Sequence, residues 1–230
     1  MNGLDVLYED NHLLIINKPA GVLVQGDETG DEPLVEIAKR YIGKKYNKPG
    51  DVFLGVVHRL DRPVSGVVAF ARTSKALERM NELFRNRETK KIYWAVLNSK
   101  PAKASDHLIH WLEKDEKKNK TTAYRAATPH GQRSELHYTI IAGEDNTFLA
   151  EVNPITGRPH QIRVQLATTG CPIAGDLKYG AKTPLDDASI ALHARRLEFL
   201  HPVKKEQLVI TAPLPGYRIW DPYRRLTEKD

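Results

Sequence analysis

The sequence predicts an α+β fold built on a mainly antiparallel sheet. Strand-like segments dominate the 230 residues, whereas segments with helical spacing of apolar residues are few and irregularly placed. This order differs from the regular strand–helix alternation that produces parallel sheets. No linker of convincing length or composition divides the chain, so we expect one compact domain over residues 1–230.

The N-terminal part contains two kinds of predicted element. Residues 4–24 alternate short apolar runs with turn residues, which predicts two or three short strands. A helix is predicted over 31–45, with Asp31 as its N-cap and Pro33 in its first turn. A second helix is predicted over 73–88, because its apolar residues recur at helical spacing. We expect both apolar stripes to form core contacts.

Strand signals dominate the remaining sequence. The predicted strands cover residues 90–98, 121–128, 134–143, 147–155, 189–202 and 206–215. A third, short helix is predicted over 158–170, with Pro159 in its first turn and Gly170 as its C-terminal stop. Ile162 and Leu166 would share one face of this helix.

The composition indicates a cytoplasmic protein with a polyanionic partner. The 35 Lys and Arg residues exceed the 29 Asp and Glu residues, which gives a formal net charge of +6. No apolar run reaches the roughly 20 residues of a membrane helix, and no signal peptide is visible. Cys171 is the single cysteine, which excludes an intramolecular disulfide and a cysteine metal cluster.

Several standard site motifs are absent from the sequence. There is no dinucleotide-binding GxGxxG, no phosphate-binding GxxxxGK[ST], no HExxH and no GxSxG. The nine histidines lack the spacing of metal ligands. We therefore predict neither a metal nor an organic cofactor.

Three polar segments remain as candidates for a site: "HRLDR" at 58–62, "KKIYWAV" at 90–96 and "NPITGRPHQIRVQL" at 153–166. Taken singly, each has a structural explanation, such as a turn carboxylate at Asp61 or a core aromatic at Tyr93. Taken together, they point to chemistry. A carboxylate held by an arginine stays ionised and suits a nucleophile. An aromatic ring beside it would stack on a planar base, as in enzymes that act on a flipped-out nucleotide.

The same residues resemble the motifs of the RluA family of RNA pseudouridine synthases. "HRLDRPVSGVVAFAR" resembles the family's HRLD signature, which implies that Asp61 is the nucleophile and that Arg59 fills the space left by the flipped base. "KIYWAVL" resembles the segment with the base-stacking tyrosine, here Tyr93. "TGRPHQIRVQL" resembles the block whose arginine, here Arg163, forms a salt bridge with the nucleophile.

The resemblance covers roughly residues 4–215, because "NKPAGVLV" and "LHARRLEFLHP" also match family blocks. It implies a mixed, mainly antiparallel sheet with flanking helices and a central active-site cleft. The implied activity isomerises specific uridines in large-subunit ribosomal RNA, transfer RNA or both, by base flipping and without a cofactor. The implied state is a monomer. Val64 stands where the family often has threonine, a change that affects turn packing and leaves the nucleophile untouched.

Substrate selection is expected to come from the catalytic domain itself, since catalytic-domain sequence begins almost at residue 1 and no separate N-terminal RNA-binding domain is expected. Residues 111–124 are predicted to form a charged hairpin or loop beside the cleft. Four lysines in this segment are predicted to contact RNA phosphates. They are Lys114, Lys117, Lys118 and Lys120.

Two other functions remain open from the residues alone. A base-excising glycosylase would pair Asp61 with a second carboxylate, but no other Asp or Glu stands in a comparably apolar, arginine-framed setting. A non-catalytic RNA-binding protein would need no such carboxylate, since it repels phosphate. Two details of the isomerisation also remain open. Asp61 attacks either C1′ or the base, and Tyr93, a water or Asp61 itself removes the C5 proton.

Overall fold

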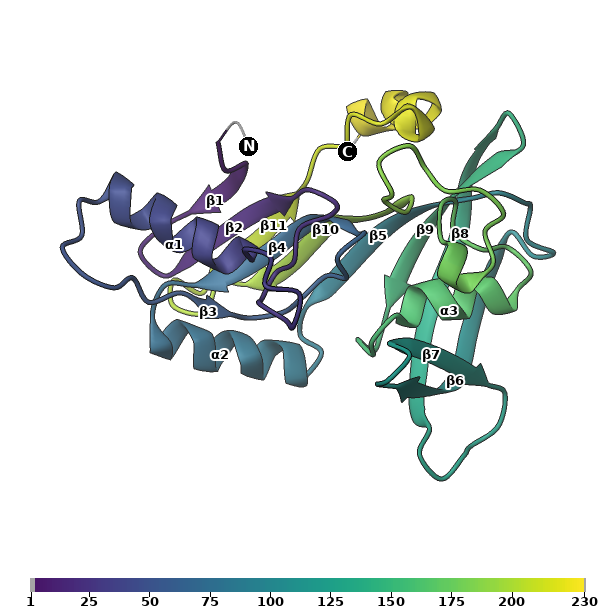
Figure 1. Cartoon of the computed structure of the whole chain (residues 1–230), viewed down its shortest axis with the longest axis horizontal. Helices are drawn as coiled ribbons and strands as arrows, with labels where there is room; N and C mark the ends of the chain where they lie inside the picture. The colour runs from purple at the N-terminus through teal and green to yellow at the C-terminus, as the bar shows by residue number, and fades with distance from the viewer. Residues whose placement is uncertain (1–2, 230) are drawn as a thin grey trace. The chain divides into compact units, whose positions relative to one another are not determined.

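The computed structural model describes residues 3–229, which fall into two compact units (Figure 1). Unit 1 is formed by Met1–Lys90 and Ala194–Pro213, and unit 2 by Lys91–His193 and Leu214–Asp230. Each unit has its own strands and helices. The expectation of one catalytic domain over residues 1–230, with a central cleft, stays a prediction.

Unit 1 is built from antiparallel strands and two helices. Its elements are β1 (Val6–Glu9), β2 (Leu13–Lys18), α1 (Leu34–Lys45), β3 (Gly55–Val56), β4 (Ser65–Ala71), α2 (Ser74–Arg85), most of β10 (Leu192–Leu200) and β11 (Gln207–Thr211). The strand order is β1-β2-β4-β10, with β3 beside β4 and β11 beside β10. The strands and helices predicted in these segments are confirmed.

One hydrophobic core of unit 1 lies between helix α2 and one face of the strands. Met80 of α2 belongs to one buried cluster with residues of β2, β4, β10 and β11. These partners are Leu13, Ile15, Val67, Ala69, Leu197, Phe199 and Ile210. Burying such side chains stabilises the fold by about 1.5–3 kcal/mol each. Thr73 caps α2 by accepting a hydrogen bond from the amide of Ala76, at 3.1 Å.

Helix α1 begins differently from the sequence prediction. Pro33 occupies the N-cap, and the carboxylate of Asp31 forms an ion pair with Arg62 at 2.7 Å. The prediction of Asp31 as N-cap is therefore wrong. The physical reason is that the first amides of the helix are already satisfied. Those of Leu34 and Val35 donate to the carbonyls of residues 23 and 24, at 2.7 and 3.2 Å.

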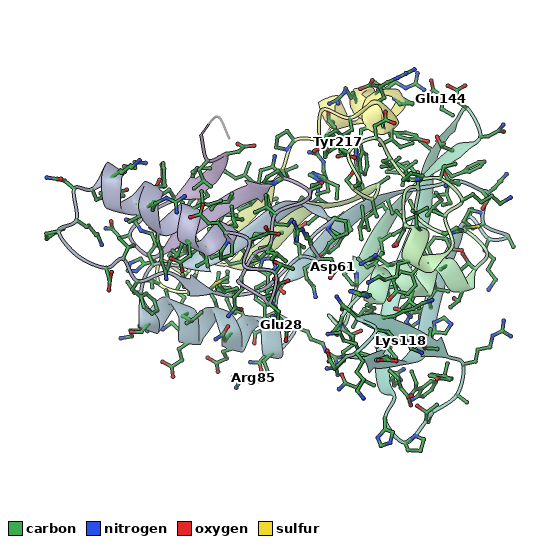
Figure 2. All side chains as sticks on the ribbon, in the orientation of Figure 1. Glu28, Asp61, Arg85, Lys118, Glu144 and Tyr217 are labelled. Atoms are coloured by element: carbon green, nitrogen blue, oxygen red, sulfur yellow. The ribbon has the colours of Figure 1, made fainter. Side chains whose placement is uncertain are left out.

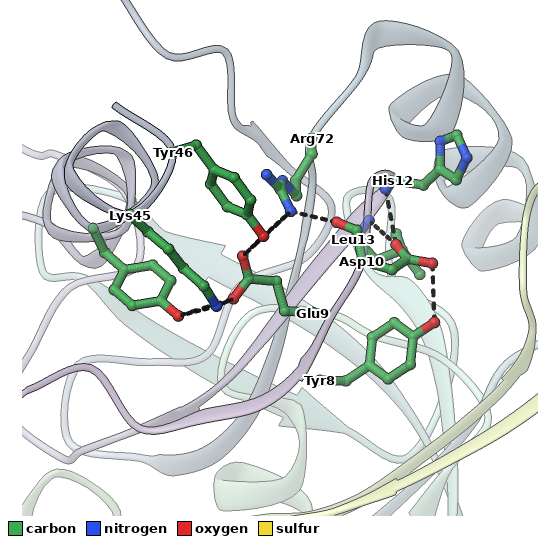
Figure 3. Close-up of polar contacts among 9 residues, drawn as sticks. Tyr8, Glu9, Asp10, His12, Leu13, Lys45, Tyr46 and Arg72 are labelled. Atoms are coloured by element: carbon green, nitrogen blue, oxygen red, sulfur yellow. Dashed lines mark hydrogen bonds and ion pairs between the residues drawn. The ribbon is translucent and has the colours of Figure 1, made fainter. Parts of the chain in front are cut away.

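A polar cluster fastens the β1–β2 turn to α1 (Figure 3). The carboxylate of Glu9 accepts hydrogen bonds from Tyr41, Lys45 and Tyr46, at 2.9, 2.7 and 2.7 Å. Next to it, Asp10 accepts hydrogen bonds from two backbone amides of the turn, each at 2.8 Å. These contacts hold the outer edge of the strands that lead to the candidate site.

Unit 2 is a five-stranded antiparallel arrangement with one α-helix. Its elements are β5 (Lys90–Leu97), β6 (Ser105–Asp115), β7 (Lys120–Tyr124), β8 (Gln132–Glu144), β9 (Thr147–Pro154), α3 (Gln161–Thr168), and the 3-10 helices η1 (Leu177–Tyr179) and η2 (Arg218–Lys229). The strand order is β5-β9-β8-β6-β7. The predicted strands are confirmed, whereas β6 and η2 were not predicted as such. The charged segment is a hairpin, in which Asp115 pairs with Lys120.

Helix α3 covers one face of these strands. The side-chain amide of Gln165 donates to the carbonyls of Leu108 in β6 and Ser134 in β8, each at 3.3 Å. The helix begins at Gln161, so Pro159 lies before it and not in its first turn as predicted. His160 occupies the N-cap with φ of 54°, and this left-handed turn separates the proline from the helix. Gly170 follows the C-cap with φ of +79°, as predicted.

Candidate active site

The Asp61 segment connects β3 and β4 in unit 1. Leu60 and Val64 are buried on either side of it, while Asp61 is half-buried (labelled in Figure 2) and Arg59 is exposed. The amide of Val64 donates to the carbonyl of Asp61 at 3.0 Å, which closes a tight turn. Two apolar anchors and one turn therefore hold a carboxylate at the edge of the core.

A glycine permits this turn to enter the sheet. Gly66 has φ of +115°, and a Cβ atom there would lie 2.3 Å from the carbonyl oxygen of Ala194 in β10. Any other residue would clash with backbone, so only glycine allows β4 to approach β10 this closely.

His58 of the HRLD segment supports the strands. Its Nε2 atom accepts a hydrogen bond from the amide of Ala69 at 3.1 Å, and its ring stacks on Phe84 of α2 at 4.9 Å. His58 thus ties the Asp61 segment to both β4 and α2.

A buried lysine, which the sequence analysis did not assign to the site, lies behind the Asp61 turn. Lys18 has 0% exposure, and its Nζ donates to the carbonyls of Val22 and Arg62, at 2.7 and 3.2 Å. Burial lowers the pKa of Lys18 to about 7, the charge of Asp61 acts to raise it, and that of Arg62 to lower it. The charge of Asp61 thus favours the protonated form of Lys18.

Backbone contacts complete this support. The amide of Gly21 donates to the carbonyl of Arg62 at 2.8 Å, and Arg62 Nε donates to the carbonyl of Gly21 at 3.0 Å. The only sequence signal for Lys18 is its position at the end of an apolar strand, directly before a proline. The "NKPAGVLV" block therefore acts on the Asp61 turn by direct contact.

Tyr93 and Arg163 both lie in unit 2. Tyr93 is a half-buried residue of β5 and pairs with Val152 of β9, which in turn pairs with Tyr138 of β8. Paired residues share a sheet face, so Tyr93 lies on the same face as Leu136 and Ser134, two and four positions along β8 from Tyr138.

Helix α3, which carries Arg163, covers this face. Gln165 contacts the carbonyl of Ser134 and also the ring of His110, whose cross-strand partner is Ser134. The structure therefore brings Tyr93 and Arg163 to one side of the unit 2 sheet.

The guanidinium of Arg163 forms a buried, bidentate ion pair with Asp176. Its Nε and Nη2 atoms lie 2.7 and 2.9 Å from the two carboxylate oxygens. Asp176 is 1% exposed and Arg163 is 5% exposed. Two parallel hydrogen bonds fix the guanidinium plane as well as its position. Tyr179 adds a ring contact, with its centroid 5.1 Å from Cζ of Arg163.

Asp176 contradicts the expectation that Asp61 is the only carboxylate in an apolar setting framed by arginine. It is a second carboxylate of this kind, buried against Arg163. Because both of its oxygens face the same guanidinium, Asp176 serves as the holder of Arg163. The sequence of the "GDLKYG" segment gives no signal that its aspartate pairs with Arg163, which lies 13 positions earlier in the chain.

The polar residues before α3 fix the start of the helix. The side-chain oxygen of Gln161 accepts hydrogen bonds from Thr156 Oγ1 and from the amide of Arg158, at 2.8 and 3.0 Å. Its amide nitrogen donates to the carbonyl of Glu135 at 2.9 Å. Arg158 itself is exposed. Gln161 is thus a structural residue that aligns the helix bearing Arg163.

The four predicted site residues are divided between the units. Asp61 and Arg59 belong to unit 1, together with Lys18, whereas Tyr93 and Arg163 belong to unit 2. The predicted salt bridge between Arg163 and Asp61 joins residues of different units and stays a prediction.

The described residues offer neither a metal site nor a membrane-spanning helix. Across residues 3–229, no three His, Cys, Asp or Glu side chains form a group suited to a metal ion. None of the helices described is long and apolar enough to cross a membrane.

Comparison with known proteins defines the class. Residues 12–168 match the family model of RNA pseudouridylate synthase. The chain is 35% identical to the ribosomal large subunit pseudouridine synthase C of Buchnera aphidicola subsp. Baizongia pistaciae (strain Bp), over 91% of this chain and 66% of that protein. It is 33% identical to the uncharacterized RNA pseudouridine synthase YhcT of Bacillus subtilis (strain 168), over 93% of this chain and 69% of that protein.

The solved structure of human RNA Pseudouridylate Synthase Domain Containing 4 has the same fold. It aligns with a TM-score of 0.77 and 26% identity, covering 92% of this chain and 89% of the human one. The predicted α+β, mainly antiparallel fold is thus confirmed as the pseudouridine synthase fold. The chain belongs to the RNA pseudouridylate synthase family. It spans about two thirds of the length of the two bacterial relatives.

Proposed function

We propose that this chain isomerises specific uridines of RNA to pseudouridine, with Asp61 as the nucleophile. The observation that carries the proposal is the position of Asp61 within the family-matched region. It is a half-buried carboxylate on a hydrogen-bonded turn, with the buried Lys18 amino group behind it. A preorganised anion of this kind suits nucleophilic catalysis, because little reorganisation is needed when it attacks.

The reaction is an isomerisation, so uridine and product have the same composition, although the C5 hydrogen is lost to a base and N1 takes up another proton. The target nucleotide flips out of its stem-loop, at a cost of a few kcal/mol that protein contacts offset. Asp61 attacks C1′ or the base, and the N1–C1′ bond breaks. The uracil turns, a C5–C1′ bond forms and the bond to Asp61 breaks, which restores the free carboxylate. The C5 proton leaves to a base and N1 gains a proton. Tyr93 or a water is the proposed acceptor, with Asp61 itself as the remaining choice.

The other site residues have proposed roles in binding. Tyr93 stacks on the flipped uracil, and Arg59, which is exposed, fills the space that the base leaves. Arg163 pairs with Asp61 as well as with Asp176, since a guanidinium has five N–H donors and Asp176 takes two. This second pairing would keep Asp61 charged and correctly aimed.

The proposed substrate is a stem-loop of large-subunit ribosomal RNA, transfer RNA or both, modified in the cytoplasm by a monomer. The relative from Buchnera is named for the ribosomal large subunit, which supports the first of these RNAs. The net charge of +6 suits any RNA. Within the β6–β7 hairpin, Lys117 and Lys118 are exposed and able to reach phosphates. The Nζ atom of Lys118 also lies 3.9 Å from Oδ2 of Asp115.

The decisive experiment measures tritium release from RNA labelled at uridine C5, taken from a synthase-deficient cell. Wild-type protein is expected to release tritium to water, and Asp61→Asn is expected to release none while binding RNA with similar affinity. Asp51→Asn is the matched control, since it makes the same change at an exposed residue of the same unit. Separate ribosomal and transfer RNA fractions identify the substrate class.

Three outcomes would contradict the proposal. Tritium release by Asp61→Asn would exclude Asp61 as the nucleophile. Free labelled uracil in place of tritiated water would indicate a base-excising glycosylase. RNA binding by wild-type protein without any release would indicate a non-catalytic RNA-binding protein.

A further inference from the structure

The side chain of Tyr179 joins three parts of unit 2. Its hydroxyl oxygen accepts a hydrogen bond from the amide of Thr121 in β7 at 2.9 Å, and it lies 2.7 Å from Nδ1 of His160, the N-cap of α3. Its ring faces the guanidinium of Arg163 at 5.1 Å. One side chain therefore contacts the β6–β7 hairpin, the start of α3 and the arginine of the candidate site.

Two further bonds fasten the hairpin to the same region. Thr121 is 2% exposed, and its hydroxyl donates to the carbonyl of Pro159 at 3.1 Å. Lys178, the neighbour of Tyr179, donates from Nζ to the carbonyl of Asn119 in the hairpin turn at 2.9 Å. The turn of the hairpin and the adjoining start of β7 are thus both held by residues adjacent to Arg163 or to its helix.

The hydroxyl of Tyr179 is well suited to transmit displacement. Burial raises the pKa of Tyr179, so the phenol keeps its proton and can donate to His160 while it accepts from Thr121. A shift of β7 therefore changes the position of a ring that packs against Arg163. The Asp176 carboxylate restrains the Nε–Nη2 edge of the guanidinium, so the ring and the carboxylate together determine its orientation.

We propose that Tyr179 is a positioning residue that couples RNA binding by the β6–β7 hairpin to the orientation of Arg163. The inference rests on the proposed function, because it requires RNA on the hairpin and Arg163 in the active site. When RNA phosphates bind the turn around Lys117 and Lys118, they hold the hairpin in one position. Tyr179 then holds the guanidinium of Arg163 in a matching orientation. Part of the binding energy at the hairpin is then used to raise kcat.

The test is a double-mutant kinetic cycle on large-subunit ribosomal RNA transcribed with 5-tritiated uridine, or on transfer RNA if only that fraction reacts. Tyr179→Phe removes the hydroxyl contacts with Thr121 and His160 and keeps the ring that packs against Arg163. We expect kcat to fall about tenfold, with KM within about threefold of the wild-type value. The hairpin variant Lys117→Ala/Lys118→Ala should raise KM and lower kcat in the wild-type background. In the Tyr179→Phe background it should raise KM only.

Tyr138→Phe is the matched control. It removes one phenolic hydrogen bond, to the carbonyl of Lys103 at 3.2 Å, at the end of β6 remote from the hairpin turn. Its kcat should equal that of wild type. Thr121→Val is a second test variant, since it removes the other link to Pro159 while keeping side-chain volume. It should lower kcat in the same direction as Tyr179→Phe.

The outcomes separate the coupling from the proposed function. If wild type releases no tritium, the proposed function fails, and the coupling that rests on it fails with it. If wild type is active and Tyr179→Phe keeps kcat within about twofold, the coupling is wrong while the function stands. The coupling is also wrong if the lysine substitutions lower kcat equally in both backgrounds, since a merely structural role of Tyr179 gives additive effects.

Discussion

The Nζ atom of Lys18 lies 3.2 Å from the carbonyl oxygen of Arg62, the residue that follows Asp61. It also lies 3.0 and 2.7 Å from the carbonyls of Pro19 and Val22. Three carbonyl dipoles therefore surround an ammonium that has no exposure to solvent. This arrangement fastens the loop after β2 to the turn that presents the candidate nucleophile.

Stability should increase with pH because of Lys18. Its pKa is lowered from 10.5 to about 7 in the folded protein, mainly by burial. Between these two pH values the unfolded state binds the proton and the folded state does not, so the free energy of unfolding rises with pH. Urea unfolding should show wild type gaining on the order of 1–2 kcal/mol relative to Lys18→Met between pH 7 and 9. A difference that stays constant over this range would contradict the burial of a titrating lysine.

Breaking the Arg163–Asp176 pair should strongly destabilise the protein. Asp176→Ala leaves a buried guanidinium without this carboxylate, and the expected loss in the free energy of unfolding is about 3–5 kcal/mol. Asp106→Ala is the control, because it breaks an exposed pair with Lys103 in the same unit and should cost only about 0–1 kcal/mol. Urea unfolding measures both. Equal losses from the two variants would show that Asp176 holds no buried charge.

Substitutions of Tyr93 should separate stacking from proton transfer. Tyr93→Leu removes the aromatic ring and should lower kcat/KM about 10- to 100-fold, the effect expected for one lost base stack. Tyr93→Phe keeps the ring, so KM should stay near the wild-type value. Steady-state tritium release measures both constants. A lower kcat for Tyr93→Phe identifies the Tyr93 side chain as the group that removes the C5 proton. An unchanged kcat identifies water or Asp61 as that group. A wild-type kcat/KM for Tyr93→Leu would contradict stacking.

The hairpin lysines should contribute to the salt dependence of RNA binding. Each phosphate contact releases counterions and makes the negative slope of log binding constant against log salt concentration steeper by about 0.7–0.9. Lys117→Ala/Lys118→Ala, at the turn labelled by Lys118 in Figure 2, should therefore reduce the slope by about 1.4–1.8. Filter binding between low and moderate salt measures it. Lys75→Ala, an exposed lysine of α2, serves as control, and a slope unchanged by the hairpin substitutions would place these lysines away from RNA.

Residue patterns predicted the elements of the fold well where apolar periodicity is strong. The strands around Ile15 and Leu149 and the helix containing Met80 follow directly from such patterns. The ends of helices were less predictable. The N-cap of α1 is set by carbonyls of a distant loop, and the start of α3 by a left-handed His160. Both depend on contacts that local sequence does not record.

The candidate site shows the same division. Short sequence motifs identify four candidate residues, because the proposed chemistry requires these side chains and the motifs follow one another in a fixed order along the chain. They are Asp61, Arg59, Tyr93 and Arg163. Their roles stay predictions until the substitutions are measured. The partners of these residues follow no motif, since Asp176 and Tyr179 meet Arg163 only through the path of the chain after α3.

By itself the sequence determined the fold class, the family resemblance and the candidate nucleophile, since periodicity and short motifs are local properties of the chain. Only the tertiary structure decided that Lys18 is buried beneath the Asp61 turn and that Asp176 holds Arg163. The physical reason is that the free energy of a buried charge depends on which distant carbonyls and carboxylates surround it. Those neighbours are chosen when the strands and helices pack together.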